Sequence, residues 1–492
     1  MYGDKVVKVE PGGIEPVAEA DKHGRPRQLF WTWTSPNLEF ATIFLGVLAV
    51  SAFGLSFWQA AAALTLGNLL GATTHGVLSA RGLTYGVPQM VLGRVAFGFW
   101  GNALPATLMS VMAGAGWFAV NSVSGAFALN SLTGLPLLLC LTVVVVVQIL
   151  IAFFGHNLVQ AFERYAFPVL AVVFAITTVV ILSKASPGTS SGTGGVGGFL
   201  LAASAAFGYT AGWNPYAADY TRYLPTGTSP RAVGWSAGSG LFLATTVLML
   251  VGAASVTIGG STSDNPATAF TGHLPGWLAA LTLLCITLGA VAANVLNVYS
   301  AALAFLTLGI RLPLAWRRAV VAVGFGVVGF VLAWLGLADA GHAFESFLLV
   351  IAYWIGPWLG VTLVDQHIRR NQQLRHVLGD TAYRNWAGPV AMLTGMIVSI
   401  GLFANQAKYR GPVPEALPWI GDITFLVGFG IAAVVYAVWR KPALPESPYT
   451  RSAFSAPTSP ASRSASAAVH DPSDTPDSST AATPLRNNTD DR

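Results

Sequence analysis

Long hydrophobic stretches separated by short polar loops make up most of the chain between residues 31 and 440. Each stretch comes close to the roughly 20 residues that a membrane-spanning helix needs. We predict twelve spans, at 36–56, 58–79, 99–128, 135–155, 162–183, 198–223, 233–258, 276–306, 318–337, 343–365, 386–405 and 419–439. The pattern predicts an all-α polytopic membrane protein.

The two ends of the chain have a different composition from these spans. Residues 1–30 are polar and mixed in charge, so we predict a flexible N-terminal arm. Residues 441–492 are rich in Ser, Thr, Pro and Ala, and such a segment cannot bury enough apolar surface to fold. We therefore predict a membrane domain of twelve helices at 31–440 and a disordered tail after it.

The composition supports this division. Of the 492 residues, 53% are hydrophobic and 10% are charged, whereas soluble proteins carry about 25% charged residues. The net charge of +5 is spread over the loops rather than gathered in a stripe, so it does not indicate nucleic-acid binding.

The basic residues predict the orientation of the chain. With an even number of spans, both termini lie on one side of the membrane. The loops on that side hold Arg81, Arg94, Arg164, Arg222, Arg231, Arg311, Arg317, Arg318, Arg369, Arg370, Arg375 and Arg384. The opposite loops hold only Lys184, Lys408 and Arg410. Because loops rich in Arg and Lys face the cytoplasm, we predict cytoplasmic termini.

The sixth span contains the most unusual stretch of the sequence, which reads GYTAGWNPYAADYTRYLP from Gly208 to Pro225. Pro215 cannot donate a helical hydrogen bond, so we predict that the helix breaks here. Irregular backbone at membrane depth is tolerated only inside protein or beside a cavity. A break flanked by Tyr209, Thr210 and Trp213 is typical of a substrate site between two half-helices, although a simple proline kink is the alternative.

Helices 3 and 8 carry amide side chains that suit a flat, polar-edged ligand. Trp117 and Asn121 lie four residues apart and therefore share one helical face, as do Asn294 and Asn297. An indole stacks on the face of a ring, and an amide offers a donor and an acceptor to its edge. The alternative is packing and interhelical hydrogen bonding alone.

A weak echo between the halves of the domain predicts two inverted five-helix repeats with a broken first helix in each. The first span resembles the sixth in having glycine near its middle, and we expect unwound backbone around Gly46 to contribute to the site. Helices 11 and 12 would then be peripheral additions.

Few carboxylates lie in or near the spans, and none is predicted to carry a proton. Asp219 precedes Arg222 by three residues, which favours an ion pair or gate at the cytoplasmic end of helix 6. Glu39 is expected within about a turn of the interface and in contact with water. Glu345 lies near the outer start of helix 10, where the helix dipole favours a carboxylate.

The motifs argue against catalysis. No cluster of His, Cys and carboxylate residues has metal-ligand spacing, and no catalytic constellation is visible, so we predict no enzymatic activity, metal or cofactor. The alternative from another class is a channel, which would show flux without saturation.

Five stretches in order resemble the purine-cytosine permease family, the nucleobase:cation symporter 1 group. They are RGLTYGVPQMVLGRVAFG after helix 2, GWFAVNSVSGA in helix 3, GWNPYAADYTRYLP in helix 6, AANVLNVYS in helix 8 and FESFLLVIAYWIGPWLG in helix 10. The resemblance covers about residues 30–440 and leaves out both tails.

The resemblance implies a LeuT-like five-plus-five inverted-repeat fold with broken helices 1 and 6. It also implies cation-coupled uptake of a purine base or cytosine across the plasma membrane. Helices 1, 2, 6 and 7 would form a bundle that rocks against a scaffold of helices 3, 4, 8 and 9. Related ring compounds, namely allantoin, hydantoin, uracil, thiamine or a pyridoxine-like ring, are the alternative substrates. The oligomeric state is left open.

The family resemblance also assigns roles to individual residues. Trp117 and Asn121 match its helix 3 positions, and Asn294 and Asn297 match its helix 8 positions. Trp213 is our first choice for the helix 6 aromatic that stacks on the ligand, with Tyr209 and Thr210 as rivals. The outer gate is expected in helix 10 around Phe344.

The coupling ion is predicted from a departure from the family pattern. Sodium-using members are expected to supply hydroxyls from helix 8 about a turn before the substrate amide. Here the stretch LGAVAA, from Leu288 to Ala293, has none. We therefore favour proton over sodium coupling.

Overall fold

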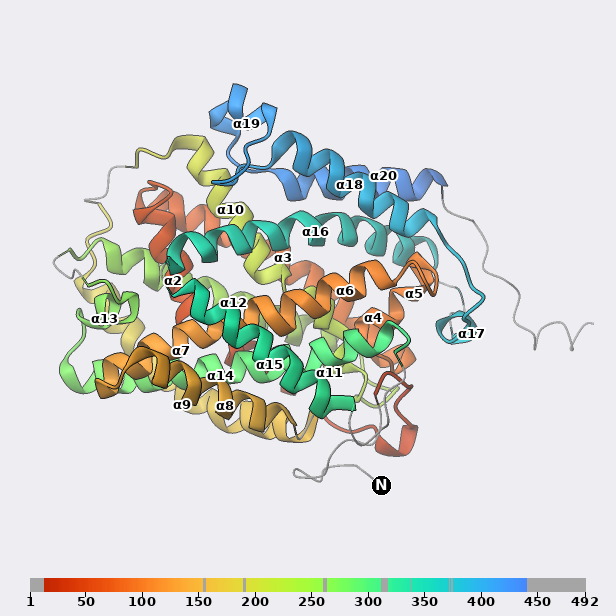
Figure 1. Ribbon diagram of the computed structural model, residues 1–492, viewed down its shortest axis with the longest axis horizontal. Helices are drawn as coiled ribbons and strands as arrows, with labels where there is room; N and C mark the ends of the chain where they lie inside the picture. The colour runs from red at the N-terminus through yellow and green to blue at the C-terminus, as the bar shows by residue number, and fades with distance from the viewer. Residues whose placement is uncertain are drawn as a thin grey trace, which may run out of the picture. The chain divides into compact units, whose positions relative to one another are not determined.

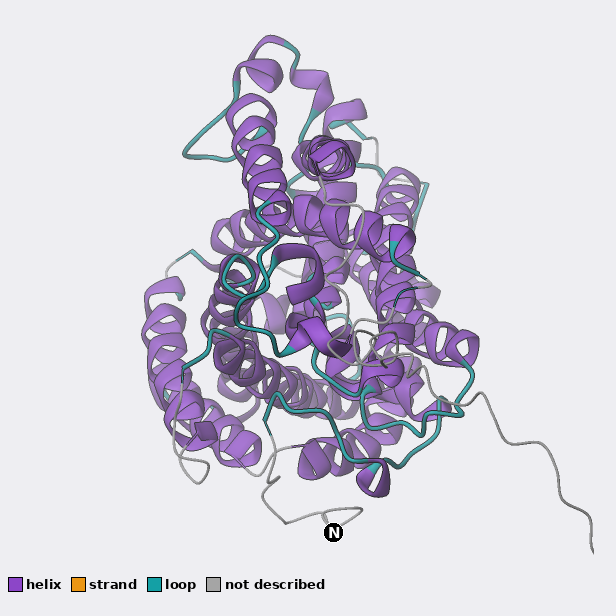
Figure 2. Ribbon diagram, turned by 90° about the vertical axis from the view of Figure 1, so that its right-hand side faces the viewer, coloured by secondary structure: helices purple, strands orange, loops and turns teal. Residues whose placement is uncertain are grey.

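The structure is a computed structural model, and it describes residues 13–153, 156–188, 192–259, 263–310, 317–337, 339–370, 372 and 375–439. The predicted disordered tail at 441–492 lies outside these residues. The described residues form helices and loops without a strand (Figure 2). An isolated antiparallel bridge joins Asn405 and Arg410.

The helices match the predicted spans closely (Figure 1). The longer elements are α3 (Phe57–Tyr85), α7 (Phe118–Thr133), α8 (Leu137–Phe153), α9 (His156–Lys184), α10 (Gly195–Ala211), α12 (Pro230–Val256), α14 (Gly276–Thr307), α15 (Arg317–Gly336), α16 (Ala340–Ile368), α18 (Ala387–Phe403) and α20 (Thr424–Trp439). The shorter ones are α1 (Arg27–Thr34), α2 (Phe40–Ser51), α4 (Gln89–Leu92), α5 (Arg94–Phe97), α6 (Ala103–Val111), α11 (Ala217–Thr221), α13 (Pro266–Thr271), α17 (Arg375–Leu378) and α19 (Pro412–Ala416).

Within the described residues, six of these helical segments are long and apolar enough to cross a membrane. Shorter apolar helices supply further segments at predicted positions. The break in helix 1 explains one of the shorter segments, because it leaves only Phe40–Ser51 as a regular helix. The arrangement is that of a polytopic helical membrane protein.

Helix 6 breaks where Pro215 predicts it. Helix α10 ends at Ala211, a 3-10 turn covers Asn214–Tyr216, and the short α-helix α11 follows directly. A simple proline kink is excluded because the regular helix is interrupted over several residues.

Helix 1 also breaks, but earlier than predicted. Helix α1 is followed by a 3-10 turn at Ser35–Asn37, and α2 begins only at Phe40. Gly46 lies inside α2, where an added Cβ would come within 1.8 Å of the Met249 carbonyl oxygen on α12. The prediction of unwound backbone around Gly46 is therefore wrong. Gly46 permits close helix packing, and Pro36 marks the break.

Helix 3 contains a distortion that the sequence analysis did not anticipate. Between α6 and α7, residues Met112–Trp117 form a π-helical turn that ends at Trp117. Glycines in this turn meet aromatic rings, since a Cβ on Gly116 would lie 2.3 Å from the Phe347 ring. Such π-turns are frequent at functional sites.

The packing separates two groups of helices. Helix α3 packs on α10 and α12, while α2 packs on α12. In the second group α7 packs on α8, α14 and α15. Helices α18 and α20 pack against α16 and against each other, as Figure 1 also shows, in agreement with their predicted peripheral place.

Residues 13–26 lie against one end of the helices, which we call the arm side. The Val17 amide donates to the Gly86 carbonyl, and the His23 amide donates to the Tyr223 carbonyl, at 2.9 and 2.6 Å. The hydroxyl of Thr226 donates to Glu19 at 2.7 Å. The arm side therefore brings together the ends of α3 and α11. We call the opposite end, where Gly194 bonds to Gly54, the far side.

Candidate functional site

The predicted amides of helices 3 and 8 meet in the interior. The Asn121 amide nitrogen donates to Asn294 Oδ1 at 3.0 Å, and the Asn297 amide nitrogen donates to the same oxygen at 3.2 Å. Asn294 in turn donates to the Phe118 carbonyl at 2.9 Å. All three side chains are buried. The structure therefore brings the amides of helices 3 and 8 together.

One polar atom of this cluster has no protein partner. Asn121 Oδ1 is buried and accepts no hydrogen bond from the described residues. A buried acceptor without a donor costs about 1–3 kcal/mol. The cluster can therefore accept a hydrogen bond from an N–H group of a ligand at this point.

Trp117 lies one helical turn from Asn121 and is surrounded by aromatic rings. Its ring centroid is 5.1 Å from Tyr209, 5.2 Å from Phe347 and 6.5 Å from Phe344, each in an edge-to-face arrangement. Tyr209 comes from α10, just before the break in helix 6. The structure thus brings Trp117 and Tyr209 together from helices 3 and 6.

Trp213 and Thr210 form their hydrogen bonds with residues other than Trp117. The Trp213 indole donates to Asn37 Oδ1 in the helix 1 break at 3.0 Å, and its ring contacts Trp33 and Tyr216. Thr210 donates to Asn68 Oδ1 on α3 at 2.6 Å. Among the three helix 6 candidates, Tyr209 is the one whose ring faces Trp117. Trp213 instead joins the two broken helices to each other.

Glu39 is placed differently from the prediction. Its side chain is 1% exposed and accepts a hydrogen bond from the Ala41 amide at 2.9 Å, which caps α2. Its other oxygen lies 3.0 Å from the Tyr209 hydroxyl. The expectation of a solvated residue near the interface is wrong because the break, and not the start, of helix 1 lies here. Pro36, three residues earlier, was the available signal.

A second residue missed by sequence reasoning is Tyr216. It lies in the 3-10 turn of the helix 6 break and donates to Asn297 Oδ1 at 2.6 Å. This bond connects the helix 6 break to the amide cluster. The signal was its place directly after Pro215.

Asp219 and Arg222 lie on the arm side, and both are buried. Asp219 accepts from the Gln89 amide at 2.9 Å. Arg222 donates to the Gly13 carbonyl at 2.7 Å and to the hydroxyls of Tyr223 and Tyr299. These hydrogen bonds hold both residues on the arm side. The ion pair between Asp219 and Arg222 stays a prediction.

Phe344 lies on the far side of the aromatic group. Its ring stacks on Phe44 at 5.9 Å, with Phe40 stacked behind Phe44 at 5.7 Å. Phe344 therefore covers Trp117 from the far side. Glu345, its neighbour, is half-buried on α16, six residues into that helix rather than at its start.

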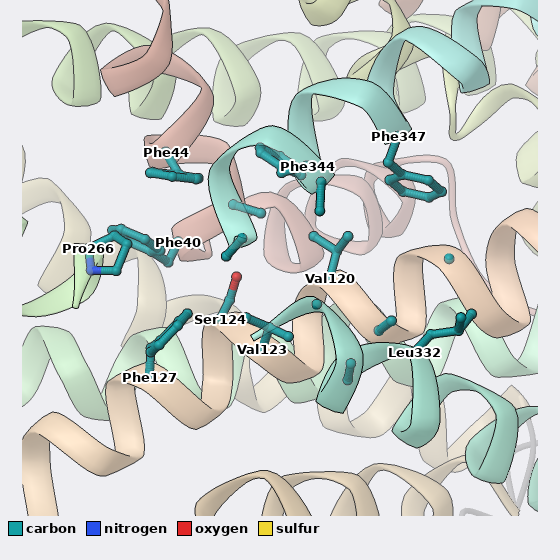
Figure 3. Close-up of a pocket in the computed structure, with 17 residues that line it drawn as sticks. Phe40, Phe44, Val120, Val123, Ser124, Phe127, Pro266, Leu332, Phe344 and Phe347 are labelled. Atoms are coloured by element: carbon teal, nitrogen blue, oxygen red, sulfur yellow. The ribbon is translucent and has the colours of Figure 1, made fainter. Parts of the chain in front are cut away.

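A pocket lies next to this aromatic cover (Figure 3). Figure 3 shows Phe44, Phe344 and Phe347 on one wall and Val120 and Ser124 on the other. Its cavity volume is about 190 Å³, and Ser124 is the one polar side chain among the lining residues that the structure describes. Because Trp117 and the amides are not in the lining, we interpret this pocket as an apolar vestibule beside the polar cluster.

Two broken helices that meet beside a buried amide cluster are typical of a membrane transporter. Residues 16–428 match the family described as permeases for cytosine/purines, uracil, thiamine and allantoin. The chain belongs to this family.

The chain is similar to several curated relatives. One is the putative purine-cytosine permease YxlA of Bacillus subtilis, which is 29% identical over 89% of this chain and 97% of the relative. Another is the purine-cytosine permease FCY2 of Saccharomyces cerevisiae, at 27% identity over 88% of this chain and 86% of the relative.

Solved structures show the same fold. Mhp1, a nucleobase-cation-symport-1 family transporter in a closed conformation with bromovinylhydantoin bound, superposes with a TM-score of 0.66 at 19% identity. The match covers 87% of this chain and 94% of Mhp1. The inward-facing conformation of Mhp1 gives the same TM-score at 20% identity. The fold is therefore the LeuT-like architecture predicted from the sequence.

Proposed function

We propose that this protein is a symporter that imports a purine base or cytosine across the plasma membrane by alternating access. The observation that carries the proposal is the pairing of Trp117 and Tyr209 beside the unpartnered acceptor of Asn121. A nucleobase has a flat face and an edge of N–H donors and ring acceptors, which these groups complement. The names of the relatives support the same substrate class.

In this proposal the base inserts between Trp117 and Tyr209 as the two groups of helices separate. Asn121 Oδ1 accepts from an N–H of the base, Asn294 Oδ1 holds the Asn121 amide, and Asn297 donates to the same Asn294 oxygen and completes the polar edge. Trp213 positions the helix 6 break through Asn37 rather than stacking on the ligand.

Gates at each end would make the transport alternate. Phe344, with Phe44, closes the far side, and Arg222, with Tyr223 and Tyr299, closes the arm side. A base that binds the closed form more tightly than either open form shifts the population toward closure. The Arg-rich loops on the arm side support a cytoplasmic position for both termini.

We favour the proton as the coupling ion. Helix α14 has no hydroxyl side chain between Leu288 and Ala293. Thr287, just before this stretch, donates its hydroxyl to the Leu283 carbonyl at 3.0 Å. Sodium prefers oxygen ligands, like other hard cations, and the side chains from Leu288 to Ala293 offer none.

The test is uptake into proteoliposomes of labelled adenine, guanine, hypoxanthine and cytosine, with allantoin, hydantoin, uracil, thiamine and pyridoxine as competitors. Imposed pH and sodium gradients are applied separately at clamped membrane potential. We expect saturable uptake of one or more of the four bases, driven by the pH gradient. Uptake of one of these ring compounds in labelled form, together with no uptake of any of the four bases, would redirect the substrate assignment. Flux without saturation would indicate a channel.

A further inference from the structure

We propose that Glu39 is the proton-binding group of this transporter. Its protonation is coupled to base binding through Tyr209, which contacts both Glu39 and Trp117. This inference rests on the proposed function, and it assigns a residue to the coupling step. Its basis is a chain of hydrogen-bonded oxygens in the break of helix 1.

The chain joins Glu39, Tyr209, Thr42 and the Asn37 carbonyl. Glu39 Oε1 lies 3.0 Å from the Tyr209 hydroxyl, which lies 2.6 Å from Thr42 Oγ1. Thr42 Oγ1 lies 2.7 Å from the Asn37 carbonyl oxygen. All four residues are buried. The chain therefore has three contacts and ends on an atom that can only accept.

Counting hydrogens distinguishes the two forms of Glu39. Each hydroxyl has one hydrogen. If Glu39 is ionised, Tyr209 and Thr42 supply two hydrogens for three contacts, so one contact lacks a donor. If Glu39 carries a proton, it donates to Tyr209, Tyr209 donates to Thr42, and Thr42 donates to Asn37. The closed arrangement is fully hydrogen bonded only with a protonated Glu39.

The remaining surroundings of Glu39 agree with this count. Its second oxygen accepts from the Ala41 amide in both forms. None of the Lys, Arg or His side chains that the structure describes forms an ion pair with it. An ionised carboxylate buried without a cation is costly inside a membrane protein. Closure around Glu39 is therefore favoured by a bound proton.

Other titratable groups lie on the helices packed against this segment, but they are not part of the chain of oxygens. They are Arg27 on α1, His75, Arg81 and Tyr85 on α3, Arg164, Tyr165 and Lys184 on α9, Arg231 on α12, and Cys285 and Tyr299 on α14. Tyr209 on α10 is the titratable side chain that contacts the carboxyl group.

The position of Glu39 also suits a coupling role. It lies where the two groups of helices meet, since a Cβ on Gly289 of α14 would be 2.8 Å from Glu39 Cβ. Tyr209 contacts Glu39 with its hydroxyl and Trp117 with its ring. Inserting a base against Trp117 must therefore act on the same residue that bonds to Glu39.

The step itself forms and breaks only an O–H bond. With the far side open, the carboxylate takes a proton from external water, and the neutral acid then completes the hydrogen-bond chain as the site closes. When the arm side opens, water separates the chain and the proton leaves to the internal solution. One proton accompanies each base.

The experiment compares wild type with Glu39→Gln in proteoliposomes, using whichever of labelled cytosine, adenine, guanine or hypoxanthine the wild type accumulates. Glu415→Gln is the matched control, because that carboxylate is exposed on α19. With one-to-one coupling and clamped potential, a gradient of one pH unit sustains about tenfold accumulation. We expect wild type and Glu415→Gln to reach that level and Glu39→Gln to show none, with exchange of base still measurable.

A second readout separates coupling from a purely structural role. Base-induced proton uptake is followed with a pH dye, and Glu39→Asp serves as the conservative variant. We expect uptake of about one proton per base in wild type, partial uptake in Glu39→Asp and none in Glu39→Gln. Should Glu39→Gln lose exchange as well, restoration of exchange and proton uptake by Glu39→Asp still supports the proposal.

Four results would overturn the inference. Proton-driven accumulation by Glu39→Gln at the wild-type level would remove Glu39 from coupling, and loss of exchange in both Glu39 variants would leave it a structural role only. Accumulation by wild type driven by sodium alone would also refute it while leaving the transporter function intact. Absence of saturable transport of every base by wild type would instead refute the proposed function, and the inference with it.

Discussion

At the scale of single residues, Asn121 and Trp117 carry the proposed recognition of the base. Asn121 is held by Asn294, and its free oxygen is buried. Replacing Asn121 with Ala removes the acceptor, so we expect a loss of about 1–3 kcal/mol of base binding. Trp117→Ala removes the stacking face. Both variants should abolish saturable base uptake while protein remains in the membrane.

The measurement is labelled-base uptake normalised to purified, reconstituted protein. Asn130→Ala on the same helix is the control, because Asn130 bonds to the Leu135 carbonyl at the end of α7. Wild-type transport by both the Trp117 and Asn121 variants would contradict the site assignment.

Trp213 provides a second prediction at this scale. Its indole donates to Asn37, so Trp213→Phe leaves a buried amide oxygen without its donor. We expect a loss of about 1–3 kcal/mol of stability and a lower unfolding temperature in detergent, with the order of preference among bases unchanged. Trp235→Phe is the control, because that side chain is 78% exposed. A changed order of preference would instead place Trp213 against the ligand.

At the scale of elements, the crossing of α2 and α12 depends on two glycines. A Cβ on Gly46 would lie 1.8 Å from the Met249 carbonyl oxygen, and one on Gly252 would lie 1.9 Å from the Ile43 carbonyl oxygen. Either Gly→Ala substitution must push the helices apart, which we expect to cost about 1–3 kcal/mol or more. The yield of folded, monodisperse protein measures this destabilisation.

Gly430→Ala on α20 is the matched control, because its added Cβ has open space. Replacing a helical glycine by alanine at such a site should be neutral or stabilising by about 1 kcal/mol. Equal yields of folded, monodisperse protein from Gly46→Ala and Gly430→Ala would show that the α2–α12 crossing tolerates separation.

The aromatic cover on α16 is the other element whose role can be tested. Phe344 stacks on Phe44 and lies against Trp117. An aromatic pair contributes about 0.5–1.5 kcal/mol beyond its burial, so Phe344→Ala should speed dissociation of a bound base severalfold. Phe127→Ala is the control, because Phe127 lines the same pocket and has no ring contact with Trp117 among those the structure records. An unchanged dissociation rate would remove Phe344 from the gate.

At the scale of the whole molecule, the N-terminal residues 13–26 tie the ends of several helices together on the arm side. The contacts run from Gly13 to Arg222, from Val17 to Gly86 and from His23 to Tyr223. Each such hydrogen bond contributes about 1 kcal/mol. Deleting residues 1–24 should therefore favour the form open on the arm side.

We expect this deletion to accelerate efflux of preloaded base severalfold, while deletion of residues 1–12 alone leaves the three contacts in place and the efflux rate near wild type. Equal efflux from the two deletions would show that residues 13–24 do not hold the arm side closed.

The sequence by itself determined the class of protein and the positions of its helices. Hydrophobic length is a local property, so the spans could be located to within a few residues, and Pro215 marked the helix 6 break because proline acts on its own turn. The pairing of Asn121 with Asn294 was also foreseeable, since amides in apolar helices must find partners. The family resemblance predicted how these helices are arranged, namely as a LeuT-like inverted-repeat fold.

Only the tertiary structure decided which residues face one another. Tyr209 and Trp213 lie four residues apart in one motif, yet the first contacts Trp117 and the second contacts Asn37. The place of Glu39 depends on where helix 1 breaks, and that break is stabilised by bonds from α2 and α10 rather than by local sequence alone. Side-chain direction near a broken helix follows from contacts between distant segments, and hydrophobic periodicity carries no information about them.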